Sequence, residues 1–124
     1  MDANQIVELD LNYVVGSIEK ELEILSGEKV LLTGGAGFLG YYFTKTILHW
    51  NALRIKKGLS TINLTLIDNF IRGLPDWLSE INQNKNLIIR EHDILDPLPT
   101  DITNIKYIIH AASIASPKFY RKHP

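Results

Sequence analysis

The sequence predicts an α/β protein with a doubly wound parallel sheet, and three observations predict it. Short apolar runs alternate along the chain with segments of helical period. A glycine cluster from Gly34 to Gly40 directly follows the first apolar run and precedes a helical segment. An acidic residue, Asp68, ends the next apolar run. Together these features are typical of a strand, a glycine turn, a helix and a second parallel strand.

The composition is that of a soluble globular protein. The 124 residues suffice for one domain, and 45% of them are hydrophobic while 22% are charged. Cysteine is absent, which excludes disulfides and thiolate metal sites. Neither a membrane-spanning run nor the basic start of a signal peptide occurs, so we expect a cytoplasmic protein that has no membrane partner.

Residues 1–28 are predicted to form an acidic helical extension. They hold seven acids and one Lys, a balance of -6, whereas residues 29–124 carry a balance of +5, so the two parts can attract each other. From about Ile6 to Leu25, apolar residues recur at helical spacing, and Ser26-Gly27 ends the pattern. Gly16 leaves open whether this is one helix or two short ones. The apolar face consists of Leu11, Val14, Val15, Ile18, Leu22 and Leu25.

The next three elements are predicted to form a parallel crossover. Lys29–Thr33 is a short apolar run typical of a strand buried on both faces. From Phe38 to about Leu53, Leu39, Phe43, Ile47 and Leu48 recur with helical period, and Lys56-Lys57-Gly58 ends this helix. Thr61–Asp68 follows as a second strand rich in apolar and β-branched residues.

The rest of the chain continues the alternation. Arg72–Pro75 is a predicted turn, and residues 76–82 a short helix with Trp77, Leu78 and Ile81 facing inward. Residues 87–91 and 106–110 are the third and fourth strands. Between them, two prolines in residues 96–101 predict a loop or a short helical turn. A complete doubly wound domain normally has about six strands, so four parallel strands with about three helices indicate an incomplete Rossmann fold.

The glycine cluster has the spacing of a phosphate-binding turn. Gly34, Gly37 and Gly40 form a G-x-x-G-x-x-G pattern, while Gly35, Gly37 and Gly40 form G-x-G-x-x-G. Such a turn leaves backbone N–H groups at a helix start free and lets a pyrophosphate approach the chain closely. The alternative is a tight strand-to-helix turn that binds no ligand.

Asp68 has the position of a residue that accepts hydrogen bonds from the ribose hydroxyls of adenosine. Its charge would repel a 2′-phosphate, which favours NAD over NADP, although Arg72 and the Lys56-Lys57 pair weaken that preference. Asp68 follows Gly40 by 28 residues, more than the usual spacing of about 20, and residues 49–60 can hold the excess. Alternatively, Asp68 is an exposed turn residue.

Four motifs together resemble a known family. They are Thr33-Gly34-Gly35-Ala36-Gly37-Phe38-Leu39-Gly40, Asp68-Asn69-Phe70, His92-Asp93-Ile94 and His110-Ala111-Ala112-Ser113. The chain from residue 29 to 124 resembles the extended short-chain dehydrogenase/reductases that modify nucleotide sugars. Within that family, the run from His110 to Pro117 is most similar to UDP-glucuronate decarboxylases, with dTDP-glucose dehydratases and sugar epimerases close to it.

The resemblance implies a set of NAD-binding residues. Gly37, Phe38 and Leu39 would contact the pyrophosphate through their backbone, and Asp93 with Ile94 would flank the adenine. Ala111 and Ser113 would lie beside the nicotinamide ribose, at the carboxyl end of the fourth strand. The full set is Gly34, Gly37, Phe38, Leu39, Asp68, Asn69, Ile71, Arg72, Asp93, Ile94, Ala111 and Ser113.

The catalytic residues of the family are not among the residues we assign. A Tyr and a Lys four positions later transfer the proton in the family, on a segment beyond the fourth strand. The chain has Tyr41 and Lys45 at this spacing, but on the helix after the glycine turn, where we interpret them as surface and packing residues. No catalytic residue is therefore predicted, and this chain is expected to be inactive alone.

Two functions remain open from the sequence. The first is the NAD-binding N-terminal portion of a nucleotide-sugar-modifying enzyme, whose NAD would accept hydride from a sugar carbon. The second is a non-catalytic nucleotide-binding or assembly module whose N-terminal helix docks on a partner. Homo-oligomerisation is open in both.

Metal and nucleic-acid partners are not predicted. The four histidines lack metal-ligand spacing. Lys118, Arg121 and Lys122 form a small basic cluster beside Phe119 and Tyr120, which we interpret as a solvated segment, because the overall charge does not favour nucleic acid.

Overall fold

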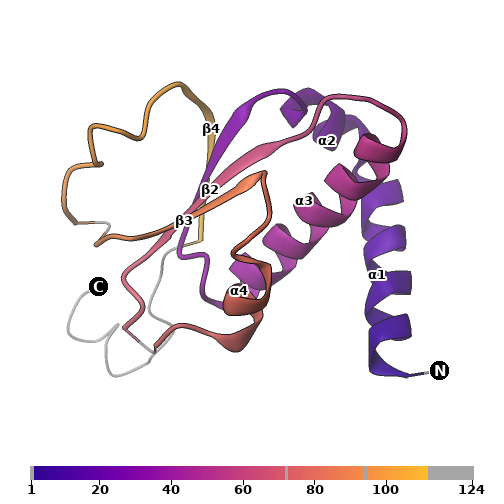
Figure 1. The fold of residues 1–124 in the computed structure, drawn as a ribbon, viewed down its shortest axis with the longest axis horizontal. Helices are drawn as coiled ribbons and strands as arrows, with labels where there is room; N and C mark the ends of the chain where they lie inside the picture. The colour runs from indigo at the N-terminus through magenta and orange to yellow at the C-terminus, as the bar shows by residue number, and fades with distance from the viewer. Residues whose placement is uncertain (1, 72, 94, 112–124) are drawn as a thin grey trace.

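The computed structural model describes residues 2–71, 73–93 and 95–111. Their helices and strands alternate in the predicted order after an N-terminal helical pair (Figure 1). The elements are α1 (Ala3–Ser17), α2 (Glu19–Leu25), β1 (Lys29–Thr33), α3 (Phe38–Lys56), β2 (Asn63–Asp68), α4 (Asp76–Ile81), β3 (Leu87–Glu91) and β4 (Ile105–His110). All strand pairs are parallel, and the sheet order is β3-β2-β1-β4. The predicted fold class, a partial doubly wound α/β sheet, is confirmed.

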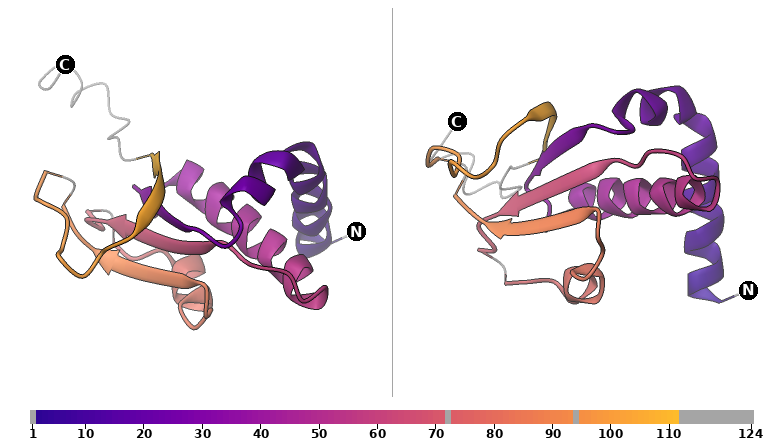
Figure 2. Two further views of the ribbon diagram at one scale, coloured as in Figure 1. Left: turned by 90° about the horizontal axis from the view of Figure 1, so that it is seen from above. Right: turned by 45° about the horizontal axis from the view of Figure 1, so that its top comes forward.

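The strand order brings the ends of β1 and β4 together. The chain moves outward from β1 through β2 to β3 and then returns to the other side of β1. Helices α3 and α4 lie on one face of the sheet, and the β3–β4 connection lies on the opposite face (Figure 2). In open α/β sheets, the point where the strand order reverses opens a crevice at the carboxyl ends of the strands. Here that point lies between β1 and β4.

The core lies between the sheet and α3. Val30 and Leu32 of β1, with Leu64 and Leu66 of β2, are almost fully buried on this face. The predicted helix is present, but only part of its apolar pattern forms the packed face: Ile47 is buried and Leu48 is half-buried. Leu39 and Phe43 are exposed, because they lie on the other side of the helix. The buried residues of α3 are Gly40, Thr44, Thr46, Ile47, Trp50 and Asn51.

Residues 3–25 form two helices, which settles the alternative that Gly16 left open. The break lies at Ile18, whose φ of -122° and ψ of 29° leave the helical region, whereas Gly16 remains inside α1. The first helix begins at Ala3, earlier than predicted, because Asp2 and Gln5 form a reciprocal capping box. Helix α1 packs against α3, and Val15 is the buried residue of α1. The division of the chain at residue 28 into two parts stays a prediction.

The β3–β4 connection has no helix among its described residues, 92–93 and 95–104, as the prolines predict. Arg90 of β3 holds this loop through an ion pair with Asp101. The hydrogen bond from Arg90 lowers the pKa of the Asp101 carboxyl below its usual value. In the part of the chain that the structure describes, no helix is long and apolar enough to cross a membrane.

Candidate functional site

The residues that follow the strands meet at one edge of the sheet. Because all four strands are parallel, their carboxyl ends share this edge (Figure 1). The glycine turn follows β1, Asp68 ends β2, Asp93 comes shortly after β3, and Ala111 follows β4. The structure thus brings the described members of the predicted site to one edge. Arg72, Ile94 and Ser113 were predicted for the same site and lie outside the described residues.

The glycine turn is shaped by close packing at two of its positions. Gly34 adopts a φ of 73°, which favours glycine, and its N–H continues the strand pairing to Ile67 O at 2.9 Å. A Cβ on Gly35 would overlap the Leu66 side chain, and a Cβ on Gly40 would overlap the backbone of Gly35. These glycines let α3 start directly against the end of the sheet.

Gly37 differs from its neighbours because the space beside it is open. A Cβ at this position would meet only Gly34 O, at 3.6 Å, which is an ordinary contact. Gly37 is the N-cap of α3, and its carbonyl accepts the first helical hydrogen bond from Tyr41 N at 2.9 Å. The backbone N–H groups of Phe38, Leu39 and Gly40 therefore precede the helical hydrogen-bond ladder. Free N–H groups at a helix start attract anions.

Asp68 is fixed by hydrogen bonds to both of its carboxylate oxygens. Oδ2 accepts from the Ala36 backbone N–H at 3.0 Å, and Oδ1 accepts from the Phe70 N–H at 2.7 Å. The half-buried carboxylate thus lies between the glycine turn and the loop after β2. An ionised carboxylate has about four acceptor positions, so two remain for other donors.

The loop after β2 is ordered by its own polar groups. Asn69 Oδ1 accepts from the Ile71 N–H at 3.0 Å, and Gly73 N donates to Phe70 O at 2.8 Å. Phe70 adopts a φ of 53°, which is uncommon for a residue with a side chain. Ile71 is 72% exposed at the tip of this loop. Asn69 and Ile71, two predicted site residues, are therefore close to Asp68.

Asp93 has a local role in the structure. Its Oδ1 accepts from the Leu95 N–H at 2.9 Å, and its carbonyl accepts from the Asp96 N–H at 3.0 Å. These bonds form a turn of the kind that Asp side chains favour. The preceding residue, His92, donates its N–H to Asp68 O at 2.8 Å, which joins this turn to the end of β2.

A contact that sequence reasoning missed joins the ends of β1 and β4. Thr33 Oγ1 and His110 Nδ1 lie 2.6 Å apart, and Ala111 donates its N–H to Thr33 O at 2.9 Å. Thr33 directly precedes the glycine turn, and its side chain is buried. The motifs contain both residues, but the spacing of 77 positions gives no signal that they touch.

Tyr41 and Lys45 pack α3 against its surroundings. The Tyr41 ring meets the Trp77 ring of α4 edge to face, with centroids 5.1 Å apart, and Lys45 Nζ lies 5.9 Å from the Tyr41 centroid. These contacts agree with the packing interpretation of the pair. In the described ranges, no group of three or more His, Asp or Glu residues could hold a metal ion.

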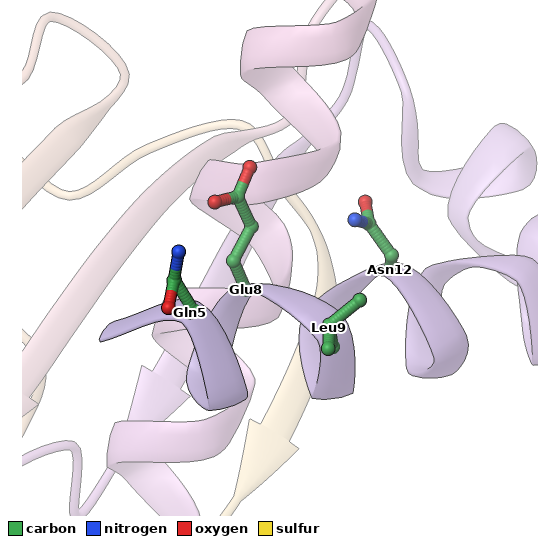
Figure 3. Close-up of a pocket in the computed structure, with 4 residues that line it drawn as sticks. All are labelled: Gln5, Glu8, Leu9 and Asn12. Atoms are coloured by element: carbon green, nitrogen blue, oxygen red, sulfur yellow. The ribbon is translucent and has the colours of Figure 1, made fainter. Parts of the chain in front are cut away.

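An open hollow lies far from this edge, on α1. It is lined by Gln5, Glu8, Leu9 and Asn12 (Figure 3). Helix α1 crosses the part of α3 most distant from the glycine turn (Figure 1). The hollow and the site at the carboxyl edge are therefore separate features.

The sequence of this chain is similar to those of UDP-glucuronic acid decarboxylases. No protein-family model matches the chain. UDP-glucuronic acid decarboxylase 1 of Danio rerio is 29% identical over 97 residues, which are 78% of this chain and 20% of that protein. UDP-glucuronic acid decarboxylase 1 of Arabidopsis thaliana is 29% identical over 96 residues, or 77% of this chain and 19% of that protein. These decarboxylases are homologues of this chain.

A solved structure of a nucleotide-sugar-modifying enzyme is also similar to this chain. UDP-N-acetylglucosamine 4-epimerase from Methanobrevibacter ruminantium M1, in complex with UDP-N-acetylmuramic acid, matches with a TM-score of 0.55 and 26% identity. The match covers 80% of this chain and 28% of the epimerase. The resemblance to nucleotide-sugar-modifying enzymes is thus confirmed. The chain spans about a fifth of the length of the decarboxylases it matches.

Proposed function

We propose that this chain binds NAD at the carboxyl edge of its sheet, as the cofactor-binding part of a nucleotide-sugar-modifying enzyme. The observation that carries the proposal is the start of α3. There, the N–H groups of Phe38 and Leu39 precede the helical ladder, and no side chain at Gly37 blocks access to them. A pyrophosphate is one of the anions that such a helix start accommodates.

The residues around the turn fit the two ends of the dinucleotide. Asp68 keeps two acceptor positions beyond its bonds to Ala36 and Phe70, and these suit the hydroxyls of an adenosine ribose. Ala111 follows β4 at the switch point, where the nicotinamide ribose would lie. The remaining residues of the proposed site are Gly34, Asn69, Ile71, Arg72, Asp93, Ile94 and Ser113.

NAD would supply a hydride acceptor, which amino-acid side chains do not provide. The described residues would bind and orient it. The names of the similar proteins state that they act on UDP-sugars, which supports a nucleotide sugar as the substrate of the complete enzyme. The choice of NAD over NADP rests on the Asp68 carboxylate, which would repel a 2′-phosphate.

Calorimetric titration of the chain with NAD and with NADP tests the proposal. We expect saturable binding of NAD and weaker binding of NADP, and fluorescence of Trp50 and Trp77 provides a second readout. Absence of saturable binding in both readouts refutes the site. Asp68→Ala should weaken NAD roughly tenfold and NADP less, because the variant loses the ribose acceptor but also the repulsive charge. Glu80→Gln, an exposed change on α4, is the control for a lost acid and should leave both affinities unchanged.

A further inference from the structure

Helix α1 uses only one of its sides to pack on the rest of the protein. Val15 is buried, and Leu11 and Ile18 are partly buried on this side. Asn12 Oδ1 lies 2.7 Å from His49 Nε2 of α3, which fixes the helix by a polar contact as well. The residues that fix α1 on α3 therefore lie on one side of α1, and the opposite side of α1 makes none of these contacts.

That other side presents an apolar stripe. Ile6, Leu9 and Tyr13 are 49%, 54% and 77% exposed. Their spacing of three and four residues places them in one row along the helix. Single exposed apolar residues are common on soluble proteins, whereas a continuous row is typical of a contact surface.

The stripe borders the hollow on α1. Gln5, Glu8, Leu9 and Asn12 line the hollow, so Leu9 belongs to both features. Figure 3 shows the Glu8 and Asn12 side chains projecting from α1, with Leu9 between them along the helix. A carboxylate and two amide groups thus lie beside an apolar residue in the lining of the hollow. Such a lining suits a side chain with an aliphatic stem and a cationic end.

The charge of α1 indicates what can cover the stripe. Glu8 and Asp10 are the charged residues within the helix, Asp2 caps it, and residues 1–19 contain neither Lys nor Arg. A second copy of the chain paired along this stripe would set these acids against one another, which costs free energy. A partner that carries Lys or Arg beside apolar residues would complement both the charge and the stripe.

We propose that the Ile6–Leu9–Tyr13 stripe of α1 is a docking surface for a basic amphipathic segment of another protein. Apolar residues of the partner would cover the stripe, and a Lys or Arg would reach Glu8 in the hollow. Recognition through residues at positions i, i+3 and i+7 is typical of helix pairs. The surface lies apart from the carboxyl edge, so it does not depend on the proposed NAD site.

The test uses a labelled helical peptide of Leu and Lys and a second peptide in which Glu replaces every Lys. Fluorescence anisotropy measures binding of each to the chain. We expect saturable binding of the Leu/Lys peptide alone, weakened by added salt. The double variant Leu9→Ser/Tyr13→Ser should weaken this binding tenfold or more, because two apolar contacts are lost. Glu8→Gln/Asp10→Asn should weaken it and reduce its salt dependence.

Controls separate the stripe from general attraction between opposite charges. Ile55→Ser removes an equally exposed apolar side chain from α3, and Asp76→Asn removes an acid from α4. Neither should change the affinity, and circular dichroism should show that the exposed substitutions keep the fold. Equal loss in the control variants, or equal binding of the Leu/Glu peptide, overturns the proposal. Sedimentation that shows a dimer abolished by Leu9→Ser/Tyr13→Ser also overturns it, because the occupant would then be a second copy.

Discussion

The Asp68 carboxylate accepts a 3.0 Å hydrogen bond from the backbone N–H of Ala36, which joins the end of β2 to the glycine turn. The same carboxylate accepts the Phe70 N–H through its other oxygen. Asp68 therefore supports the turn before any ligand is present. A dinucleotide would meet a carboxylate already fixed in position, and such preorganisation lowers the entropic cost of binding.

Asp68→Asn should destabilise the ligand-free protein. The amide oxygen can accept from one of the two backbone N–H groups, while the amide nitrogen faces the other donor without an acceptor. We expect a loss of about 1–2 kcal/mol in the free energy of unfolding, measured by urea denaturation without NAD. Glu91→Gln should change it by less than about 0.5 kcal/mol. If Asp68→Asn matches that control, the bond to Ala36 contributes little to the turn.

The glycines of the turn should separate into structural and ligand-access positions. Gly37→Ala should keep most of the stability, within about 1 kcal/mol, because φ is -83° and a Cβ makes only an ordinary contact. It should still weaken NAD about tenfold, since the methyl group would occupy the approach to the N–H groups of α3. Calorimetry and urea denaturation measure the two effects. Unchanged NAD affinity in Gly37→Ala would place the pyrophosphate elsewhere.

Gly40→Ala, in contrast to Gly37→Ala, should lose stability. Its Cβ would overlap the Gly35 backbone, and neither group can move without separating α3 from the sheet. We expect a loss of about 1–3 kcal/mol or more in unfolding free energy, which is typical of overpacked cores. The denaturation midpoint measures this loss. A stable Gly40→Ala protein would show that the turn is looser than the structure indicates.

The strands could be predicted from sequence because each is a short apolar run with clear ends. Lys29–Thr33 and Leu87–Glu91 were predicted residue by residue, and the glycines between β1 and α3 left one reasonable interpretation. The buried face of α3 could not be predicted so well. It contains Thr44, Thr46 and Asn51, and the Asn51 amide is satisfied by hydrogen bonds to the backbone N–H and carbonyl of Ile62. Such long-range pairing of polar groups leaves no periodic signal.

The site was predictable to the extent that parallel strands place the residues after them at one edge. The contacts within the site were not. Ala36 acts through its backbone N–H, which every residue type but proline has, so its identity carries no signal for the bond to Asp68.

The break in the N-terminal helix lies at Ile18, two residues after Gly16, the position at which the sequence suggested a break. A glycine costs about 1 kcal/mol inside a helix, which local packing can offset, so Gly16 did not set the boundary.

The Arg90–Asp101 ion pair should make a small, pH-dependent contribution to stability. The hydrogen bond from Arg90 lowers the pKa of Asp101 in the folded state. The stabilisation by the ion pair is therefore fully present above the pKa of Asp in the unfolded chain, about 4. It is lost as the pH falls through the lower pKa of the folded state. We expect the melting temperature of the wild type to fall more steeply than that of Asp101→Asn below about pH 4. Above about pH 5 the two curves should run parallel.

Salt provides the control for this pair. The Asp101 side chain is 63% exposed and that of Arg90 is 37% exposed, so solvent reaches the pair and high ionic strength should reduce the difference between the wild type and Asp101→Asn. Glu91→Gln, on the same strand, should follow the wild type across the acid range. Parallel curves at all pH values would show that the ion pair does not hold the β3–β4 loop in solution.

Thr33 and His110 should be energetically coupled, because their side chains touch at 2.6 Å where β1 and β4 end. In a double-mutant cycle of Thr33→Val and His110→Leu, each single variant should lose about 1 kcal/mol of unfolding free energy. The double variant should lose less than the sum, with a coupling of about 0.5–1.5 kcal/mol. Thr33→Ser keeps the hydroxyl and should retain the coupling.

NAD affinity measured on the same proteins tells whether this contact also prepares the site. Ala111 is held against Thr33 by its own backbone bond, so the strand ends should stay paired in every variant of the cycle. If the side-chain contact positions the residues after β4, NAD should bind several-fold more weakly to both single variants and should recover in Thr33→Ser. Additive losses of stability, with equal NAD affinities throughout, would mean that the two side chains do not act together in solution.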